Sequence, residues 1–371
     1  MKILLAGGGL QGLSCGASLY KNHKVSVIGK DLQIAKSRFF EQSFDFVKGE
    51  DIYPLLEQGQ YDVLLPISDF TVPFISQHKK EIEERFKVKC AVPDYEQVYV
   101  VEDKRRFMDF CEKNDLPHPK TGRLTEETLD AVANEVGFPA LVKPDYSVGA
   151  RGITRVNSLD ELKKQFPCIS EKYGSCTLQE FIDNKDYYFN VMLYRNKEGK
   201  IIASAILKII RMYPVWAGSS SCCVTVEDAE LMNICTECLD KLHWVGMADF
   251  DVLQRLDNGE FKIIEINARV PASLRGAAIS GVNFPEIIVN DVMGNDVPQY
   301  IYKPGKTMRF TGLDIMWFLK SPCRFSTSPS WFKFFGKNIY YQDIYKEDVS
   351  TWWTWLAEGI KKIGKRNKIL R

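Results

Sequence analysis

The sequence predicts an α/β protein that begins with a doubly wound parallel sheet domain. Over residues 1–100, short apolar runs alternate with amphipathic stretches, an order that places helices on both faces of a parallel sheet. The chain has 371 residues, too many for one ordinary core, so we expect two or three domains. Hydrophobic residues make up 45% of the chain and charged residues 26%, as in ordinary globular proteins.

Each element of the N-terminal region is predicted from its local pattern. Short apolar runs predict strands, and longer amphipathic stretches predict helices. The expected strands cover residues 3–6, 24–28, 63–67 and 87–91, and the expected helices cover residues 10–21 and 71–86. The first apolar run is too short for a signal peptide and continues into three glycines, so it predicts the first strand.

Residues 101–295 predict a second domain, and residues 296–371 a Trp-rich extension with a basic tail. Within residues 101–118 a helix is expected from Glu102 to Asn114, closed by a Leu-Pro-His-Pro segment, because proline ends helices. The other expected helices cover residues 125–136, 158–165, 226–241 and 283–293; the expected strands cover 138–144, 152–156, 175–181, 187–194 and 201–210, with a hairpin at 247–267. Residues 138–180 carry a glycine-bearing loop and should form a flexible lid.

Composition excludes several classes of protein. The formal net charge is +1, so no global charge points to nucleic acid or to a membrane. No apolar run approaches the roughly 18–20 residues that span a bilayer, so no integral membrane segment is expected. The ten cysteines lack the spacing of a disulfide framework or of a zinc site, and reduced thiols fit a cytoplasmic protein. The tail from Trp352 favours a core-capping helix over a membrane-surface helix.

A hairpin predicts a metal site. Asp257-Asn258-Gly259 is a strong turn signal, and a turn centred near Asn258 places Asp251 opposite Glu265 and Asp249 opposite Asn267. Carboxylates directly across a strand pair repel each other, so a divalent cation between them is expected. Alternate residues of a strand share a face, which aligns Glu265, Asn267 and Arg269. Either Asp249 or Asp251 could be the metal ligand on this strand. The alternative is that both aspartates point to solvent or to a basic neighbour.

Two further segments predict contacts to a nucleotide. Lys143 ends a strand before a loop that contains Gly149 and Gly152; glycines let main-chain N–H groups approach an anion, and the lysine adds a positive charge. An ordinary surface turn is the alternative. The segment from Gln179 to Asp186 can offer main-chain groups to an adenine edge and a carboxylate to ribose hydroxyls, which alone is a weak signal.

Taken in order, these motifs resemble the ATP-grasp superfamily over residues 1–295. The motifs are Lys104 on a helix, Lys143 before the glycine loop, the Gln179-Glu-Phe-Ile segment with Asp186, Asp251, and the Glu265-x-Asn267-x-Arg269 strand. The similarity is to the carbamoyl-phosphate-synthase-like group. It implies an ATP-grasp fold of two subdomains between the N-terminal domain and the C-terminal extension.

The resemblance also implies roles for individual residues. ATP would be bound by Lys104, Lys143, Ser147, Gly149, Gly152, Gln179, Glu180, Phe181, Ile182 and Asp186. Mg²⁺, with Mn²⁺ as an alternative ion, would be held by Asp251, Glu265 and Asn267, while Arg269 and Lys143 would act in catalysis. The proposed substrate contacts are Gly9, Lys208, Ser219 and Arg275.

The implied activity is that of an ATP-dependent carboxylate–amine ligase that forms an amide through an acyl phosphate and releases ADP and phosphate. The partners would be a small carboxylate and a small amine, and the resemblance allows a homodimer. One alternative is an amino acid–amino acid ligase of the pyrrolysine-biosynthesis type, which the Gly-Gly-x-Leu-Gln-Gly start resembles. Another is a non-catalytic ATP-binding protein. A nicotinamide enzyme that uses Gly7–Gly12 is the third, with Asp31 as the only candidate acid.

Overall fold

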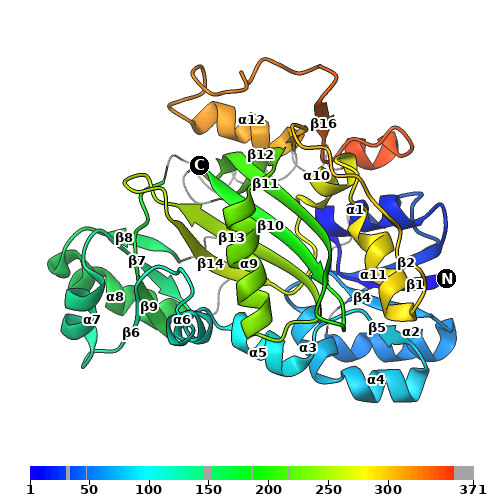
Figure 1. The fold of residues 1–371 in the computed structure, drawn as a ribbon, viewed down its shortest axis with the longest axis horizontal. Coiled ribbons are helices and arrows are strands. Elements are labelled where there is room, and N and C mark those ends of the chain that lie inside the picture. Colours follow the sequence, from blue (N-terminus) through cyan, green and yellow to red (C-terminus); the bar gives the residue numbers. More distant parts are fainter. Residues whose placement is uncertain (31–33, 47, 146–151, 185–186, 216–217, 355–371) are drawn as a thin grey trace, which may run out of the picture.

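Three sheets and a C-terminal extension make up the molecule (Figure 1). The structure, a computed structural model, describes residues 1–30, 34–46, 48–145, 152–184, 187–215 and 218–354. Within these ranges, no helix is long and apolar enough to cross a membrane. In the view of Figure 1 the N-terminal sheet lies at the right, the largest sheet in the centre and the smallest at the left, with the extension at the top.

The N-terminal sheet is parallel throughout, with the strand order β3-β2-β1-β4-β5. Its strands are β1 (Lys2–Ala6), β2 (Lys24–Gly29), β3 (Gln42–Asp45), β4 (Val63–Pro66) and β5 (Lys89–Cys90). On β1, Leu4 packs into one apolar core while Ile3 and Leu5 pack into another. Both faces of the sheet are therefore covered, and the predicted doubly wound parallel sheet is confirmed.

Helices surround this sheet, and one expected helix proves to be two. They are α1 (Gly9–Leu19), the 3₁₀ turn η1 (Gly49–Asp51), α2 (Ile52–Gly59), α3 (Thr71–Gln77), α4 (Lys79–Phe86) and α5 (Tyr95–Glu102). The helix predicted over 71–86 breaks at His78, and β3 and α2 were not predicted. Gly7 has φ +136°, and a Cβ there would lie 2.8 Å from the Ile67 side chain. The opening glycine motif thus serves close packing.

A small antiparallel sheet with its own core lies between helices α7 and α8 and the rest of the chain. Its order is β6-β9-β7-β8, from β6 (Thr121–Leu124), β7 (Ala140–Pro144), β8 (Thr154–Val156) and β9 (Cys176–Glu180). The helices here are α6 (Lys104–Lys113), α7 (Leu129–Val136) and α8 (Leu159–Tyr173). The helix expected from Glu102 to Asn114 begins at Lys104, because Asp103 is extended and caps α6, accepting from the N–H of Arg106 at 2.9 Å.

The central sheet has seven strands in the order β14-β13-β10-β11-β12-β15-β16. They are β10 (Tyr188–Arg195), β11 (Ile201–Tyr213), β12 (Ser219–Val226), β13 (Gly246–Gln254), β14 (Phe261–Asn267), β15 (Thr307–Arg309) and β16 (Ile339–Tyr341). Alternation along β10 directs Val191 to the core that contains α9 (Ala229–Lys241) and Met192 to the core that contains α10 (Leu274–Ile279) and α11 (Phe284–Met293). Helix α12 (Thr311–Lys320) packs on β11 and β12.

Candidate active site

The hairpin of β13 and β14 brings the predicted acidic residues together. Asp251 pairs with Glu265, and Asp249 pairs with Asn267, as the turn signal predicted. The turn itself is centred slightly earlier, between Asp257 and Asn258, and a bulge beside Ile264 restores the register. Without that extra residue Glu265 would face the opposite side of the sheet, since one residue of slip reverses every side chain.

Burial and mutual repulsion dominate the chemistry of these carboxyl groups. Burial raises the pKa of Asp251 well above its usual range, and the nearby carboxylates of Glu265 and Asp249 raise it further. This repulsion favours the protonated form of Asp251 when no cation balances the carboxylates. Burial also raises the pKa of Asp249, against the opposing effect of Arg269. Tyr188 faces the same group, and its pKa is raised by burial and by these acids.

The donor set fits Mg²⁺. Carboxylate and amide oxygens are the ligands that hard cations prefer, and one buried oxygen of Asp249, Oδ1, has no hydrogen-bond partner. Within the described ranges no three Asp, Glu, His or Cys side chains form a ligand group by themselves. The ion would therefore also require Asn267 and oxygens from a bound phosphate, as Mg²⁺ commonly does. Asp251 is half-buried whereas Asp249 is 1% exposed, which favours Asp251 as the direct ligand.

Asn190 supports the acidic group from the neighbouring strand. Its amide Nδ2 donates to Asp251 Oδ1 at 2.8 Å, and its Oδ1 accepts from the Ser273 hydroxyl at 2.6 Å. Strand β10 pairs Asn190 with Asp251, so the amide lies on the same face as the acids. Sequence reasoning did not assign a role to Asn190 or Ser273, because neither lies in a recognisable motif.

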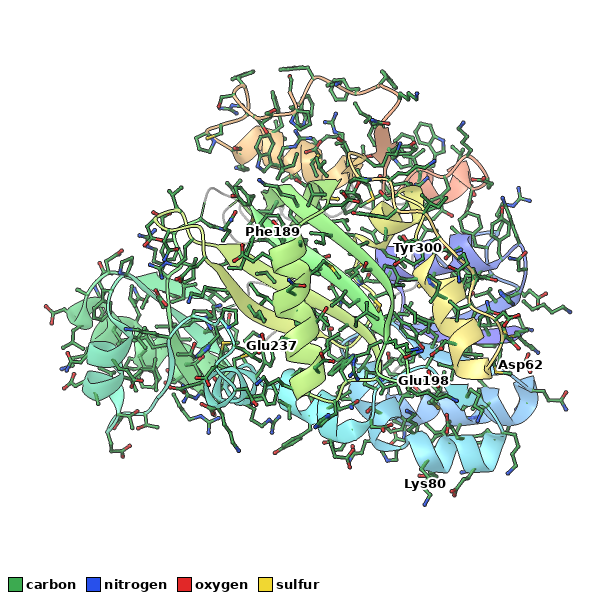
Figure 2. The ribbon with its side chains drawn as sticks, in the orientation of Figure 1. Asp62, Lys80, Phe189, Glu198, Glu237 and Tyr300 are labelled. Carbon is green, nitrogen blue, oxygen red and sulfur yellow. The ribbon has the colours of Figure 1, made fainter. Side chains whose placement is uncertain are left out.

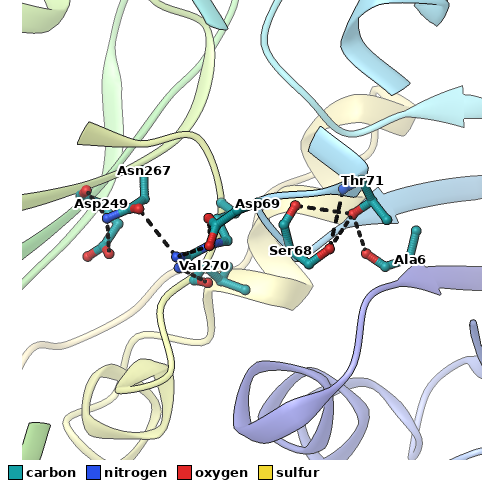
Figure 3. A network of polar contacts seen from close by, with 8 residues as sticks. Ala6, Ser68, Asp69, Thr71, Asp249, Asn267 and Val270 are labelled. Carbon is teal, nitrogen blue, oxygen red and sulfur yellow. Dashed lines mark hydrogen bonds and ion pairs between the residues drawn. The ribbon is translucent and has the colours of Figure 1, made fainter. Parts of the chain in front are cut away.

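Arg269 connects the hairpin to the N-terminal domain (Figure 3). Its guanidinium binds both carboxylate oxygens of Asp69, at 2.5 and 3.2 Å, and donates to Asn267 Oδ1 at 3.2 Å. Asp69 lies in the turn just after β4, separated from its last residue by Ile67 and Ser68. The Ser68–Thr71 contact at 3.0 Å fixes this turn, and Thr71 donates to the Ala6 carbonyl. Sequence reasoning missed Asp69, although carboxyl ends of parallel strands commonly bear ligand-binding residues.

Lys143 and Lys104 approach the acidic residues of the hairpin from the side of the small sheet. Lys143 is 8% exposed and donates to Gln179 Oε1, while Gln179 Nε2 donates to Thr121 at 3.1 Å. Burial lowers the pKa of Lys143 to about 8; the charge of Glu265 opposes the fall, and that of Lys104 adds to it. The structure therefore brings together Lys143, Lys104, Gln179 and Glu265, from four separate segments of the chain.

The expected adenine segment lies at the end of β9. The main-chain N–H groups of Glu180 and Phe181 donate to the Lys120 and Pro139 carbonyls, so these two N–H groups serve the sheet. The Glu180 carboxylate binds Arg255, and the Arg155 guanidinium lies 4.1 Å from the centroid of the Phe181 ring. Ile182 is buried. A cation thus lies on the Phe181 ring in this structure.

Part of the predicted phosphate and ribose set lies outside the described residues. These residues are Ser147, Gly149 and Asp186. Asp31, the candidate acid of the nicotinamide alternative, also lies outside the described residues. Gly152 is described, with φ +78°, and a Cβ there would lie 2.8 Å from the Pro144 ring. Glycine is thus required at the return of the loop into β8.

The four predicted substrate residues do not gather at the metal strand. Lys208 pairs with Phe189, on the sheet face opposite Asn190, and its Nζ lies 3.6 Å from the Tyr187 ring centroid beside a separate cavity of about 300 Å³. Ser219 begins strand β12 opposite Tyr213 and not a loop.

The other two predicted substrate residues, Arg275 and Gly9, lie in different surroundings. The Arg275 guanidinium donates to the Tyr341 and Ile344 carbonyls and stacks on Tyr345 at 3.6 Å. Its donors therefore bind the C-terminal extension, where a substrate contact was expected. Gly9 is exposed at the start of α1 with φ +69°, at the carboxyl end of β1. Of the four, Gly9 alone keeps a place compatible with substrate binding.

Part of the chain matches a known domain family. Residues 101–273 match the ATP-grasp domain family, so the chain carries an ATP-grasp domain and the resemblance drawn from its motifs is confirmed.

Several proteins of known name are similar to this chain. The chain is 25% identical over 281 residues to a D-aspartate ligase of Enterococcus faecium, covering 71% of this chain and 62% of that protein. It is 23% identical over 303 residues to a carbamoyl phosphate synthase large chain of Agathobacter rectalis, covering 76% and 26%. The chain thus spans less than two thirds of either relative. Among solved structures, a biotin carboxylase–β,γ-ATP complex from Campylobacter jejuni has a TM-score of 0.69 at 16% identity, covering 82% of this chain and 74% of that one.

Proposed function

We propose that the protein is an ATP-dependent carboxylate–amine ligase that acts through an acyl phosphate. The observation that supports this most is the meeting of Lys143 with Glu265, Asp251 and Arg269 between the small sheet and the central hairpin. Cations for phosphate oxygens and oxygen ligands for a metal ion are the two groups that phosphoryl transfer requires.

The residues of the chain divide the work by position. Lys104 and Lys143 would bind the phosphates, the Glu180–Ile182 segment the adenine, and Asp186 the ribose. Mg²⁺ held by Asp251, Glu265 and Asn267 would neutralise charge on the phosphates. Arg269, fixed by Asp69, would stabilise the negative charge that develops on the transferred phosphoryl group.

The chemistry requires no side-chain nucleophile. A carboxylate oxygen of the substrate attacks the γ-phosphorus, the bond to the bridging oxygen breaks, and ADP leaves. The amine of the second substrate then attacks the acyl carbon, phosphate leaves with the carbon–oxygen bond electrons, and the amine nitrogen releases a proton. The protein contributes positioning and charge stabilisation.

An amino acid is the substrate class that the similarity favours. One relative is named D-aspartate ligase, and an amino acid–amino acid ligase was the alternative that the opening motif suggested. The exposed Gly9 lies at the carboxyl end of β1 on the N-terminal sheet, and Asp69 at the carboxyl end of the neighbouring β4. This edge of the N-terminal sheet faces Arg269, so the amino acid substrate would bind here. The resemblance also allows a homodimer, and light scattering would measure the oligomeric state.

The experiment is a screen of amino acids and small acids for stimulated ADP release in the presence of Mg²⁺. We expect ADP and phosphate, and a hydroxamate when hydroxylamine replaces the amine. AMP and pyrophosphate as products would refute the acyl phosphate route.

A matched pair of variants separates this proposal from a non-catalytic ATP-binding protein. Glu265→Gln removes a ligand of the metal site, whereas Glu260→Gln changes the exposed end of the same hairpin. We expect loss of turnover only in Glu265→Gln. Equal turnover in both variants would favour the non-catalytic alternative.

A further inference from the structure

The C-terminal extension exposes a set of large apolar side chains. Phe335 is 87% exposed, Phe325 75%, Leu319 57%, Phe332 55% and Ile315 42%. Scattered exposed apolar residues are ordinary, but a contiguous group of this kind marks an interaction site. Two of the exposed rings are contiguous: Phe325 and Phe332 stack with centroids 6.3 Å apart, and both contact Phe318 at 5.6 Å. Phe335 follows Phe332 by three positions in the chain.

The charges around these side chains have one sign. Between residues 315 and 342 the chain has four basic residues and no acidic residue. Lys320, Lys333 and Lys337 are exposed and Arg324 is half-buried, while the flanking Asp314 and Asp343 are only 2% and 4% exposed. The aromatic–basic face, defined as Ile315, Leu319, Lys320, Arg324, Phe325, Phe332, Lys333, Phe335 and Lys337, is therefore apolar and positive.

A buried ion cluster holds this face in place. Asp314 of α12 accepts from Arg211 Nε at 2.8 Å and from Arg309 Nε at 2.7 Å, which ties α12 to β11 and β15. The Trp331 indole donates to the Asp314 carbonyl at 3.0 Å, and its ring stacks on Phe318 at 4.1 Å. The exposed rings thus rest on a buried base, so their exposure is a feature of the folded structure.

The face projects from the molecule. In Figure 1, α12 and the segment after it lie at the top of the view, and Figure 2 shows side chains of this part pointing away from the body. Exposed rings surrounded by lysines suit the surface of a lipid bilayer, which is negative at its boundary and apolar beneath. Aromatic side chains insert into the apolar layer, and lysines contact the head groups. A helix or peptide partner would require a groove, and nucleic acid would not require exposed aliphatic residues on α12.

We propose that the aromatic–basic face docks the protein on the surface of an anionic lipid bilayer. The contact is peripheral: phenylalanines enter the interface, and the lysines attract acidic head groups. The sequence adds six basic residues and no acid over positions 361–371, which strengthens the same attraction. The proposal is independent of the ligase activity, since none of the face residues belongs to the metal or phosphate site.

Vesicle co-sedimentation with the full-length protein tests this proposal. We expect binding to vesicles that contain phosphatidylglycerol, little binding to pure phosphatidylcholine, and weaker binding as NaCl is raised. Phe325→Ser and Phe335→Ser should each weaken binding by about tenfold or more, as expected for the loss of one inserted aromatic ring. Ile301→Ser is the matched control, because Ile301 is also 75% exposed but lies outside the face.

Three results would overturn the proposal. The first is no binding to anionic vesicles by a folded wild-type protein. The second is equal binding by the phenylalanine variants and by Ile301→Ser, which would assign attraction to charge outside the face. The third is a concentration-dependent dimer in light scattering that the phenylalanine variants abolish, because that result would make the face a protein interface.

Discussion

Lys143 carries the prediction with the clearest magnitude. Burial lowers its pKa from 10.5 to about 8, which at 1.36 kcal/mol per pK unit corresponds to about 3 kcal/mol against the charged amine. The folded protein releases this proton near pH 8 and the unfolded chain only near 10.5, so the unfolded chain binds more protons in between. The contribution of Lys143 to stability therefore becomes more favourable as pH rises through that window, and it is least favourable below pH 8.

Substitution of its two charged neighbours should move this pKa in opposite directions. Glu265→Gln removes a charge that raises the pKa of Lys143, so the pKa should fall, whereas Lys104→Met removes a charge that lowers it, so the pKa should rise. We expect changes on the order of one pK unit. The measurement is ¹³C NMR of labelled lysine side chains, with Lys143→Arg to assign the signal and the exposed Lys80→Met as the control variant.

The same shift predicts proton uptake when a nucleotide binds. At pH 8 about half of the Lys143 amines are neutral, and a triphosphate beside them restores the charge, which takes up roughly half a proton. Calorimetry in buffers of different ionisation enthalpy measures this uptake, and it should be absent in Lys143→Arg because arginine stays charged. A Lys143 signal that titrates near pH 10.5, or equal uptake in the arginine variant, would refute the reasoning.

Three further predictions follow from other contacts. Asp69→Asn should lower kcat/KM for ADP release roughly tenfold, since it removes the bidentate partner of Arg269; unchanged kinetics would assign its positioning to Asn267 alone. Asp314→Asn leaves Arg211 and Arg309 buried without a counter-charge and should destabilise the protein by about 3–5 kcal/mol in thermal unfolding; a change below about 1 kcal/mol would contradict this. Burial raises the pKa of Asp249 and Asp251, so the stability of the protein without Mg²⁺ should fall as pH rises through those raised values. The affinity for Mg²⁺ should increase over the same rise in pH, and calorimetry should detect protons released on binding. An affinity for Mg²⁺ that does not depend on pH would contradict this prediction.

The parts of the site that the sequence predicted are those set by short-range structure. The pairing of Asp251 with Glu265 depends on one turn and the strand alternation around it, so the Asp257-Asn258-Gly259 signal sufficed. Lys143 was found because a strand, a lysine and glycines stand together in the chain. The missed break at Asp103 was also local, since an aspartate three residues before a helical N–H is a capping signal.

The parts that the sequence did not predict depend on contacts between distant segments. Asp69 and Arg269 are 200 positions apart, and no pattern near either residue names the other. Lys208 was assigned to the substrate because it ends an apolar run, but which face of β11 it occupies depends on pairing with β10. Arg275 has the chemistry of a carboxylate clamp, and only the folded extension shows that the Tyr341 and Ile344 carbonyls take its donors.

The two sets of shifted pKa values describe one electrostatic condition. Without ligands, burial favours the neutral amine of Lys143 and the protonated forms of Asp249 and Asp251, so the site holds fewer charges than its residues could supply. A triphosphate favours the charged lysine, and a divalent cation favours the charged carboxylates. Nucleotide alone should therefore take up protons and metal alone should release them, while the two together largely cancel. Each ligand supplies the charge that the other half of the site lacks, so the affinity for either should be higher in the presence of the other.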